Sequence, residues 1–296
     1  MAWLRGGVTG ALIVLSTLIV FTLMLLPAMA RQVLPAGAPR LFCDQALNFL
    51  ATGWVAMNNA WLATAASLPW QVCGLGGLMP HRSYLVSINH QCWADILILQ
   101  RIFHHRIPFL RPFLKRELRP ASAIGLAWRV LDFPFVRCNS ESDAGHGDLA
   151  TTRSACQKYK RTPTAVLGFA EGARFTAARH ASQRSPYRHL LMPKVNGLGV
   201  ALATMGEQFD ALLDVTIVYP DGAPRLWDLM CGRAGAVCVN VRRRRVPSGV
   251  VGGDLVRDQA YRRRVRAWLA EQWAEKDRLI DARLAAHRAG REPRAG

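Results

Sequence analysis

The feature that most constrains this chain is an uncharged stretch close to its N-terminus. Gly6–Ala30 is a run of 25 residues without a formal charge, and Leu, Ile, Val and Met predominate at its centre. A helix rises 1.5 Å per residue, so about 20 apolar residues cross a bilayer core of ~30 Å. The run therefore predicts a helix that spans a membrane or inserts deeply into it.

A secretory signal peptide is the alternative interpretation of this run. Arg5 would supply its basic region, and Ala28-Met29-Ala30 would supply a small-residue cleavage site. The apolar core of a signal peptide usually extends over only ~7–15 residues. The stretch here is longer and is followed by further apolar sequence, which favours a membrane anchor.

A second uncharged region, Gln45–Pro80, follows the first. Its large apolar residues recur at steps of three and four, the spacing of one helical face; they are Leu47, Leu50, Trp54, Met57, Trp61, Ala65 and Leu68. Polar residues such as Asn58 fall largely on other faces. Two interpretations stay open, a buried core helix and a helix in the headgroup layer, where tryptophan is favoured. Residues 1–80 are predicted to be an anchor made of a hydrophobic helix and an amphipathic interfacial helix.

Positive charge is concentrated after this anchor. The chain has 38 Lys and Arg against 20 Asp and Glu, a formal charge of +18, and residues 1–80 hold only three of these basic residues and one acid. Because basic residues accumulate on the cytoplasmic side of membrane segments, we expect residues 81–296 on that side. An anionic membrane surface explains the excess at least as well as nucleic acid does.

The cysteines argue against two other classes. The chain has seven, an odd number, and none forms a Cys-x-x-Cys pair. This spacing is not that of a zinc site or of a disulfide scaffold, and it fits a reducing compartment. We therefore expect neither a metal nor a bound cofactor.

The first catalytic candidates follow a short apolar run at Tyr84–Ile88, which predicts a strand. His90 lies two residues after it, and four residues separate His90 from Asp95. In one helix the two side chains would point ~140° apart, so their pairing needs a loop at the strand end with Asp95 in the first turn of a helix. A histidine oriented by a carboxylate is a general base. A structural histidine is the alternative.

A second apolar run, Thr164–Phe169, predicts another buried strand and ends in Glu171-Gly172-Ala173-Arg174. Gly172 permits a tight turn, and the planar guanidinium of Arg174 suits bidentate contact with a phosphate. A structural Glu171–Arg174 ion pair is the alternative interpretation.

Taken in order, these motifs resemble the 1-acyl-glycerol-3-phosphate (lysophospholipid) acyltransferase family. The run Phe209–Pro220 is similar to the bacterial branch described as probable acyltransferases. Asn89-His90-x-x-x-x-Asp95 is similar to the first motif of that family and Phe169-x-Glu171-Gly172-x-Arg174 to its third. Phe113–Leu118 with Phe135-Val136-Arg137 resembles the second, and Leu190–Lys194 resembles the fourth. The resemblance covers about residues 80–235.

The resemblance implies an α/β fold, with one acyltransferase domain at 81–296 built on a central mixed sheet flanked by helices. It implies a membrane-bound enzyme that transfers an acyl chain from acyl-CoA or acyl carrier protein to a lysophospholipid, with 1-acyl-glycerol-3-phosphate giving phosphatidate. The expected location is the cytoplasmic face of a bacterial inner membrane. His90 would be the base and Asp95 its partner, and the acceptor phosphate would be held by a group of five residues. These are Glu171, Gly172, Arg174, Arg137 and Lys115.

Two positions depart from the family pattern. Ala173 stands where the family normally has threonine, so a hydroxyl is missing, and Cys92 stands where serine is usual. A cysteine two residues from the base invites an acyl-cysteine interpretation, but the family pattern requires no covalent intermediate. Direct transfer is therefore the predicted mechanism.

The C-terminal part carries two clusters of arginine. Arg242–Arg245 ends a strand-like run, and Arg262–Arg264 opens a predicted helix. A solvated face and attraction to anionic lipid both remain open. The rival class is a membrane-tethered nucleic-acid-binding protein that uses these clusters. No zinc finger, aromatic RNA-binding signature or Walker loop supports it, so no nucleic acid is expected.

Overall fold

The computed structural model describes residues 1–35, 37–65, 70–115, 135–136, 153–154, 156–157, 159–160, 162–255 and 257–291. Its helices are α1 (Ala2–Val33), α2 (Ala38–Ala65), α3 (Ala94–Phe103), α6 (Ala177–Gln183), α7 (Asn196–Met205), α8 (Leu226–Met230) and α9 (Gln259–Arg291), with short 3-10 turns at Gly206–Gln208 and Ser248–Val250. Its strands are β1 (Trp70–Cys73), β2 (Ser83–Ile88), β3 (Leu110–Pro112), β4 (Leu114–Lys115), β5 (Phe135–Val136), β6 (Ala165–Phe169), β7 (Phe209–Val218) and β8 (Val237–Arg244).

Six of the strands form one mixed sheet in the order β1-β8-β7-β2-β6-β3. All neighbouring pairs are parallel except β7 and β8, which are antiparallel. β2 lies in the middle, between β6 and β7, and its last five residues are buried. A strand covered on both faces reads as a continuous apolar run, which is why Tyr84–Ile88 does not alternate with polar residues. The predicted α/β fold with a central mixed sheet is confirmed.

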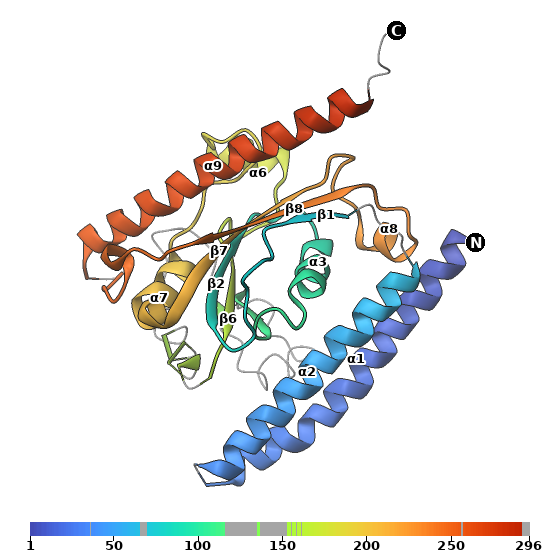
Figure 1. Ribbon diagram of the computed structural model, residues 1–296, viewed down its shortest axis with the longest axis vertical. Coiled ribbons are helices and arrows are strands. Elements are labelled where there is room, and N and C mark those ends of the chain that lie inside the picture. The colour runs from blue at the N-terminus through green and yellow to red at the C-terminus, as the bar shows by residue number, and fades with distance from the viewer. Residues whose placement is uncertain are drawn as a thin grey trace.

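Helices cover both faces of this sheet (Figure 1). Successive residues of β2 point to opposite faces, so Tyr84, Val86 and Ile88 pack with α3, whereas Leu85 packs with α7 and α9. α9 begins near the second arginine cluster, as the sequence predicts.

The two N-terminal helices form an antiparallel hairpin that lies beyond α3 (Figure 1). The α1 residues that face inward are mostly small, and Gly6 comes so close to Cys231 that a Cβ there would lie 2.3 Å from its Sγ. In the middle of the hairpin, Trp54 Nε1 donates to Thr17 Oγ1 at 2.9 Å, and the Trp54 ring packs on Phe21. Small residues let the two helix backbones approach closely.

The packing of α2 bears on the prediction of an interfacial helix after the first apolar run. Four residues of its predicted apolar face, Leu47, Leu50, Trp54 and Met57, join the apolar cluster between α1 and α2. That stretch of the face is therefore covered by protein rather than by headgroups. Asn58, which was expected on a polar face, is buried and accepts a 3.5 Å hydrogen bond from Ser16 Oγ. The helix also begins earlier than predicted, at Ala38.

α1 exposes most of its apolar side chains. It is the one helix in the described ranges that is long and apolar enough to cross a membrane, and only 28% of its most apolar window is buried. The exposed apolar residues of the hairpin are Trp3, Leu4, Val8, Val14, Leu15, Leu18, Ile19, Leu23, Leu26, Met29 and Val33 on α1, with Leu41, Phe42 and Phe49 on α2. This continuous apolar surface is compatible with membrane association.

Three arginines of the first cluster, Arg242, Arg243 and Arg244, form ion pairs within the protein. Arg242 and Arg244 both pair with Glu275, at 3.0 and 2.5 Å, and Arg243 pairs with an aspartate of β7 at 2.7 Å. Since these guanidinium groups already have carboxylate partners, they are less available to anionic lipid or nucleic acid than the sequence indicates.

Candidate active site

The candidate site lies where three neighbouring parallel strands end. β2, β6 and β7 run side by side, with Ile88 opposite Phe169 on one neighbour and opposite Val215 on the other. A polar residue lies within two positions of each strand end: His90 after β2, Glu171 after β6 and Tyr219 after β7. Carboxyl ends of parallel strands meet at one edge of a sheet, where α/β proteins usually keep their chemistry.

His90 and Asp95 form the pair that their spacing predicts. His90 Nδ1 lies 2.8 Å from Asp95 Oδ2, across a loop that leads into α3. Asp95 is in the first turn of α3 and is completely buried. Because a carboxylate only accepts hydrogen bonds, Nδ1 carries the proton and Nε2 keeps a lone pair. Nε2 makes no hydrogen bond to any described residue, and the His90 side chain is 15% exposed.

The backbone around Asp95 fixes the loop. Asp95 Oδ2 also accepts from the N–H groups of Gln91 and Cys92, at 2.7 and 3.0 Å. The Phe169 ring packs on the imidazole of His90 with centroids 4.1 Å apart, and the Phe175 N–H donates to the His90 carbonyl at 2.8 Å. The loop after β6 is thereby fastened to the loop after β2.

Two further residues, to which the sequence assigns no role, complete this arrangement. Asn89 is buried and clamps the end of β7: its Nδ2 donates to the Ile217 carbonyl, and the Ile217 N–H donates to its Oδ1, both at 2.9 Å. The Tyr219 hydroxyl, two residues beyond, donates to Asp95 Oδ1 at 2.5 Å. Asn89 adjoins the histidine in the first motif, but no local signal connects Tyr219 to Asp95.

Cys92 has the wrong environment for a nucleophile. Its thiol is buried, and its Sγ lies 3.5 Å from Asp95 Oδ1. Burial and the neighbouring Asp95 carboxylate raise its pKa to about 11. A thiol with so high a pKa supplies almost no thiolate at neutral pH. The geometry thus favours the direct-transfer prediction over the acyl-cysteine alternative.

Glu171 lies behind the surface of the site. Its carboxylate is 1% exposed and makes no hydrogen bond of good geometry among the described residues. Burial raises its pKa to about 8, and the nearby backbone N–H groups of His90 and Leu191, with the Lys276 ammonium, offset only part of that effect. The predicted contact between Glu171 and a phosphate would therefore have to be indirect. Gly172, next in the chain, has φ +65°, a conformation that favours glycine.

Arg174 is the exposed cation of the loop after β6. Its guanidinium carbon lies 5.3 Å from the centre of the Trp93 ring, which is 49% exposed beside His90. The guanidinium forms no ion pair with any described residue. The alternative interpretation, a structural Glu171–Arg174 pair, is not what the structure shows. Arg174 instead stands over an aromatic face at the mouth of the site.

A buried ionic network supports the sheet behind Glu171. Lys276 of α9 is fully buried, and its Nζ lies 2.6 Å from Asp214 Oδ1 of β7 and donates to the Val215 carbonyl. Asp214 also pairs with Arg244 at 3.1 Å. Burial lowers the pKa of Lys276, and the Asp214 carboxylate opposes that change.

Several known proteins are similar in sequence to this chain. No family model matches the chain. Over 280 residues it is 25% identical to lysocardiolipin acyltransferase 1 of Danio rerio, covering 87% of this chain and 66% of that protein. Over 235 residues it is 25% identical to 1-acyl-sn-glycerol-3-phosphate acyltransferase epsilon of Mus musculus, covering 71% and 60%. The chain is thus similar in sequence to these two acyltransferases.

The fold agrees with that relationship. The crystal structure of the 1-acyl-sn-glycerophosphate (LPA) acyltransferase PlsC from Thermotoga maritima matches with a TM-score of 0.54 at 16% identity, over 95% of this chain and 98% of that one. Coverage this high includes the helical hairpin as well as the sheet. The chain spans just under two thirds of the length of the Danio rerio relative.

Other residues predicted for the site are not all described. Arg137 lies outside the described residues, as do residues 116–118 of the second motif. Of Lys115 only the backbone, in β4, is described. The fourth motif is in place: the Lys194 N–H donates to the Ala170 carbonyl at 2.7 Å, which holds it against the Glu171 turn.

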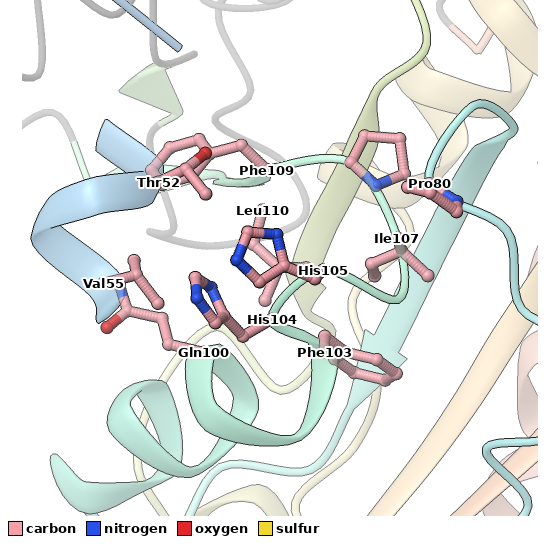
Figure 2. A pocket seen from close by; sticks show the side chains of 11 residues that line it. Thr52, Val55, Pro80, Gln100, Phe103, His104, His105, Ile107, Phe109 and Leu110 are labelled. Carbon is pink, nitrogen blue, oxygen red and sulfur yellow. The ribbon is translucent and has the colours of Figure 1, made fainter. Parts of the chain in front are cut away.

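A cavity of about 200 Å³ lies away from the His90–Asp95 pair (Figure 2). It is formed between α2 and the end of α3, whereas Asp95 stands at the start of α3, about 12 Å away along the axis. The rings of His104 and His105 meet there with centroids 3.9 Å apart. Burial and the adjacent His105 lower the pKa of His104.

Proposed function

We propose that this chain is a thioester-dependent O-acyltransferase that acylates a lysophospholipid, with 1-acyl-glycerol-3-phosphate as acceptor and phosphatidate as product. The observation that carries the proposal is the geometry of His90. Its Nδ1 is held by a buried carboxylate, while its Nε2 is free at the sheet edge where two further loops converge. This is the arrangement that a general base for a hydroxyl requires.

In the proposed reaction, His90 Nε2 removes the proton from the acceptor hydroxyl as its oxygen attacks the thioester carbonyl. A tetrahedral oxyanion forms and collapses, breaking the carbon–sulfur bond. The imidazolium returns its proton to the departing thiolate of CoA or acyl carrier protein. Asp95 stays ionised throughout and stabilises the imidazolium. The elevated thiol pKa at Cys92 is consistent with direct transfer that forms no acyl-cysteine.

The acceptor phosphate is assigned to Arg174. This guanidinium is exposed, stands over Trp93 and lies on a loop that is hydrogen-bonded to the His90 carbonyl through Phe175. A planar fork of donors matches phosphate oxygens, and the adjacent apolar ring supports it. Arg137 and Lys115 are proposed to add positive charge. Glu171 and Gly172 are proposed to shape the turn that presents Arg174.

The enzyme is proposed to act at the cytoplasmic face of a bacterial inner membrane. The exposed apolar face of the α1–α2 hairpin provides the attachment, because such a large apolar surface is costly in water. The concentration of basic residues after residue 80 favours the cytoplasmic side. A water-insoluble acceptor and its product would then remain in the bilayer throughout turnover.

The test is a panel of donors and acceptors with the purified full chain in detergent or lipid nanodiscs. 1-Acyl-glycerol-3-phosphate should yield phosphatidate with acyl-CoA or with acyl carrier protein, as followed by mass spectrometry. Lysocardiolipin and other lysophospholipids form the comparison arms, and His90→Ala is the control for background acylation. If no lysophospholipid is acylated with either donor, the proposed reaction is wrong.

A further inference from the structure

Tyr219 occupies a position that the chemistry of His90 and Asp95 alone does not explain. It follows β7 directly, 124 residues after Asp95 in the chain, and its side chain is buried. Its hydroxyl donates to Asp95 Oδ1 at 2.5 Å, the oxygen that His90 does not use. The hydroxyl therefore touches the carboxylate and not the reacting atoms.

A count of the donors around Asp95 shows what this hydroxyl contributes. Oδ2 accepts from His90 Nδ1 and from the N–H groups of Gln91 and Cys92. Oδ1 accepts from the Tyr219 hydroxyl and from the Cys92 thiol at 3.5 Å, a weak donor. Without the Tyr219 hydroxyl, one oxygen of a fully buried carboxylate would lack a strong donor, which is costly.

Tyr219 is also held in place independently of Asp95. Asn89, the residue before His90, makes two 2.9 Å hydrogen bonds to the backbone of Ile217, the second residue before Tyr219. This clamp fixes the end of β7 relative to the His90 loop. The tyrosine hydroxyl therefore meets Asp95 at a distance set by the sheet, as a preorganised donor does.

We propose that Tyr219 is a positioning residue of the acyl-transfer reaction: by donating to Asp95 Oδ1 it orients the carboxylate toward His90 Nδ1 and sets how strongly that carboxylate attracts the imidazole proton. This inference rests on the proposed function of His90 as the base. The ionisable groups around Asp95 are His90 and Cys92 from its own loop, Tyr219 from the end of β7 and Glu171 from the end of β6.

The direct test is Tyr219→Phe in the full chain, which removes the hydroxyl and keeps the ring. The kcat should fall about 10–100-fold, the range for loss of a hydrogen bond to a buried charge. KM for both substrates should stay within about twofold, because Tyr219 does not contact them. With its charge less satisfied, Asp95 should attract the imidazolium more strongly. The acid limb of the pH–kcat profile should therefore move to higher pH, by about half a unit or more.

Tyr261→Phe is the matched control. Tyr261 is also fully buried, and its hydroxyl donates a 2.9 Å hydrogen bond to the Val250 carbonyl beneath α9. Both variants should lower the melting temperature, but Tyr261→Phe should leave kcat and its pH profile unchanged. If Tyr219→Phe behaves like the control, with lower stability and an unmoved profile, the role of Tyr219 is only structural and the proposal is wrong.

A double-mutant cycle asks whether Tyr219 acts through Asp95. In an Asp95→Ala background, Tyr219→Phe should change kcat by less than about threefold, since the group it positions is absent. An undiminished 10–100-fold loss in that background would mean that the hydroxyl acts elsewhere, which overturns the proposal.

A measurement that needs no turnover separates this proposal from the proposed function. In protein labelled with [¹³C]histidine, the His90 ring signal, identified by its absence in His90→Gln, is followed against pH. Tyr219→Phe should move the midpoint of this titration upward, and Tyr261→Phe should not. If the wild-type chain acylates nothing, the proposed function is refuted. An upward shift of the His90 midpoint in Tyr219→Phe would still support the coupling between Tyr219 and His90 through Asp95. An unmoved midpoint would refute the coupling even in an active enzyme.

Discussion

Replacing Glu171 by glutamine should change how the stability of the protein depends on pH. The carboxyl is 1% exposed, and burial raises its pKa from 4.5 to about 8. At ~1.4 kcal/mol per pH unit, a rise of this size corresponds to a free-energy difference on the order of 5 kcal/mol between the two protonation states. Glutamine keeps the shape and stays neutral at every pH.

The direction follows from proton binding. Between pH 4.5 and about 8, the folded wild-type protein keeps the Glu171 proton, whereas the unfolded chain has released it. The folded state then binds more protons, so its stability falls as the pH rises through this window. Below pH 4.5 both states are protonated and this contribution to stability is fully present. Above about pH 8 the charged carboxylate is buried and the loss is complete.

The assay is thermal unfolding of both proteins in one detergent, followed by tryptophan fluorescence from pH 5 to pH 9. The melting temperature of Glu171→Gln should rise relative to that of wild type as the pH increases, by about 10 °C across the range. Glu271→Gln is the control, because Glu271 is exposed on α9, and its difference from wild type should stay flat. If the Glu171→Gln difference is equally flat, the buried carboxyl does not hold its proton and the reasoning about the site is refuted.

Further predictions concern catalysis. His90→Ala should lower kcat by about 10²–10⁴-fold with little change in acceptor KM, as measured by steady-state kinetics. Asp95→Asn should also lower kcat. Normal turnover in His90→Ala would exclude His90 as the general base. Arg174→Ala should chiefly raise KM for the lysophospholipid. Arg174→Lys should lower this KM only part of the way back, because an ammonium lacks the planar fork of donors. An unchanged acceptor KM in Arg174→Ala would mean that Arg174 does not bind the phosphate. Cys92→Ala should retain turnover and show no acyl-protein by intact mass, whereas abolished turnover would favour an acyl-cysteine route.

The local features of the candidate site are readable from the sequence. Apolar runs of five or six residues mark β2 and β6, and the polar residues directly after them occupy the carboxyl edge of the sheet. The separation between His90 and Asp95 excludes a shared helical face and predicts the loop that the structure contains. These inferences succeed because they depend on backbone geometry over a few residues.

The sequence also misleads where a residue's surroundings come from distant segments. Arg242 and Arg243 look like a free basic patch, but they form ion pairs with Glu275 of α9 and Asp210 of β7. Leu47, Leu50, Trp54 and Met57 fit a face in the headgroup layer as well as a core face, but they pack against α1. In both cases the pattern identifies side chains that are stabilised by a charged or apolar contact. Only the fold shows that another part of the same chain makes that contact.

The sequence by itself determines the anchor-like N-terminal run, the order of the motifs and the identity of the candidate base, since each of these is contained within a short segment. The tertiary structure alone decides what those residues experience. Because the fold places β7 beside β2, the Tyr219 hydroxyl contacts Asp95, although the two residues are 124 positions apart. The fold also buries Glu171, and burial raises its pKa to about 8. Hydrogen-bond partners and burial are properties of packing between distant segments, and no local pattern of residues encodes them.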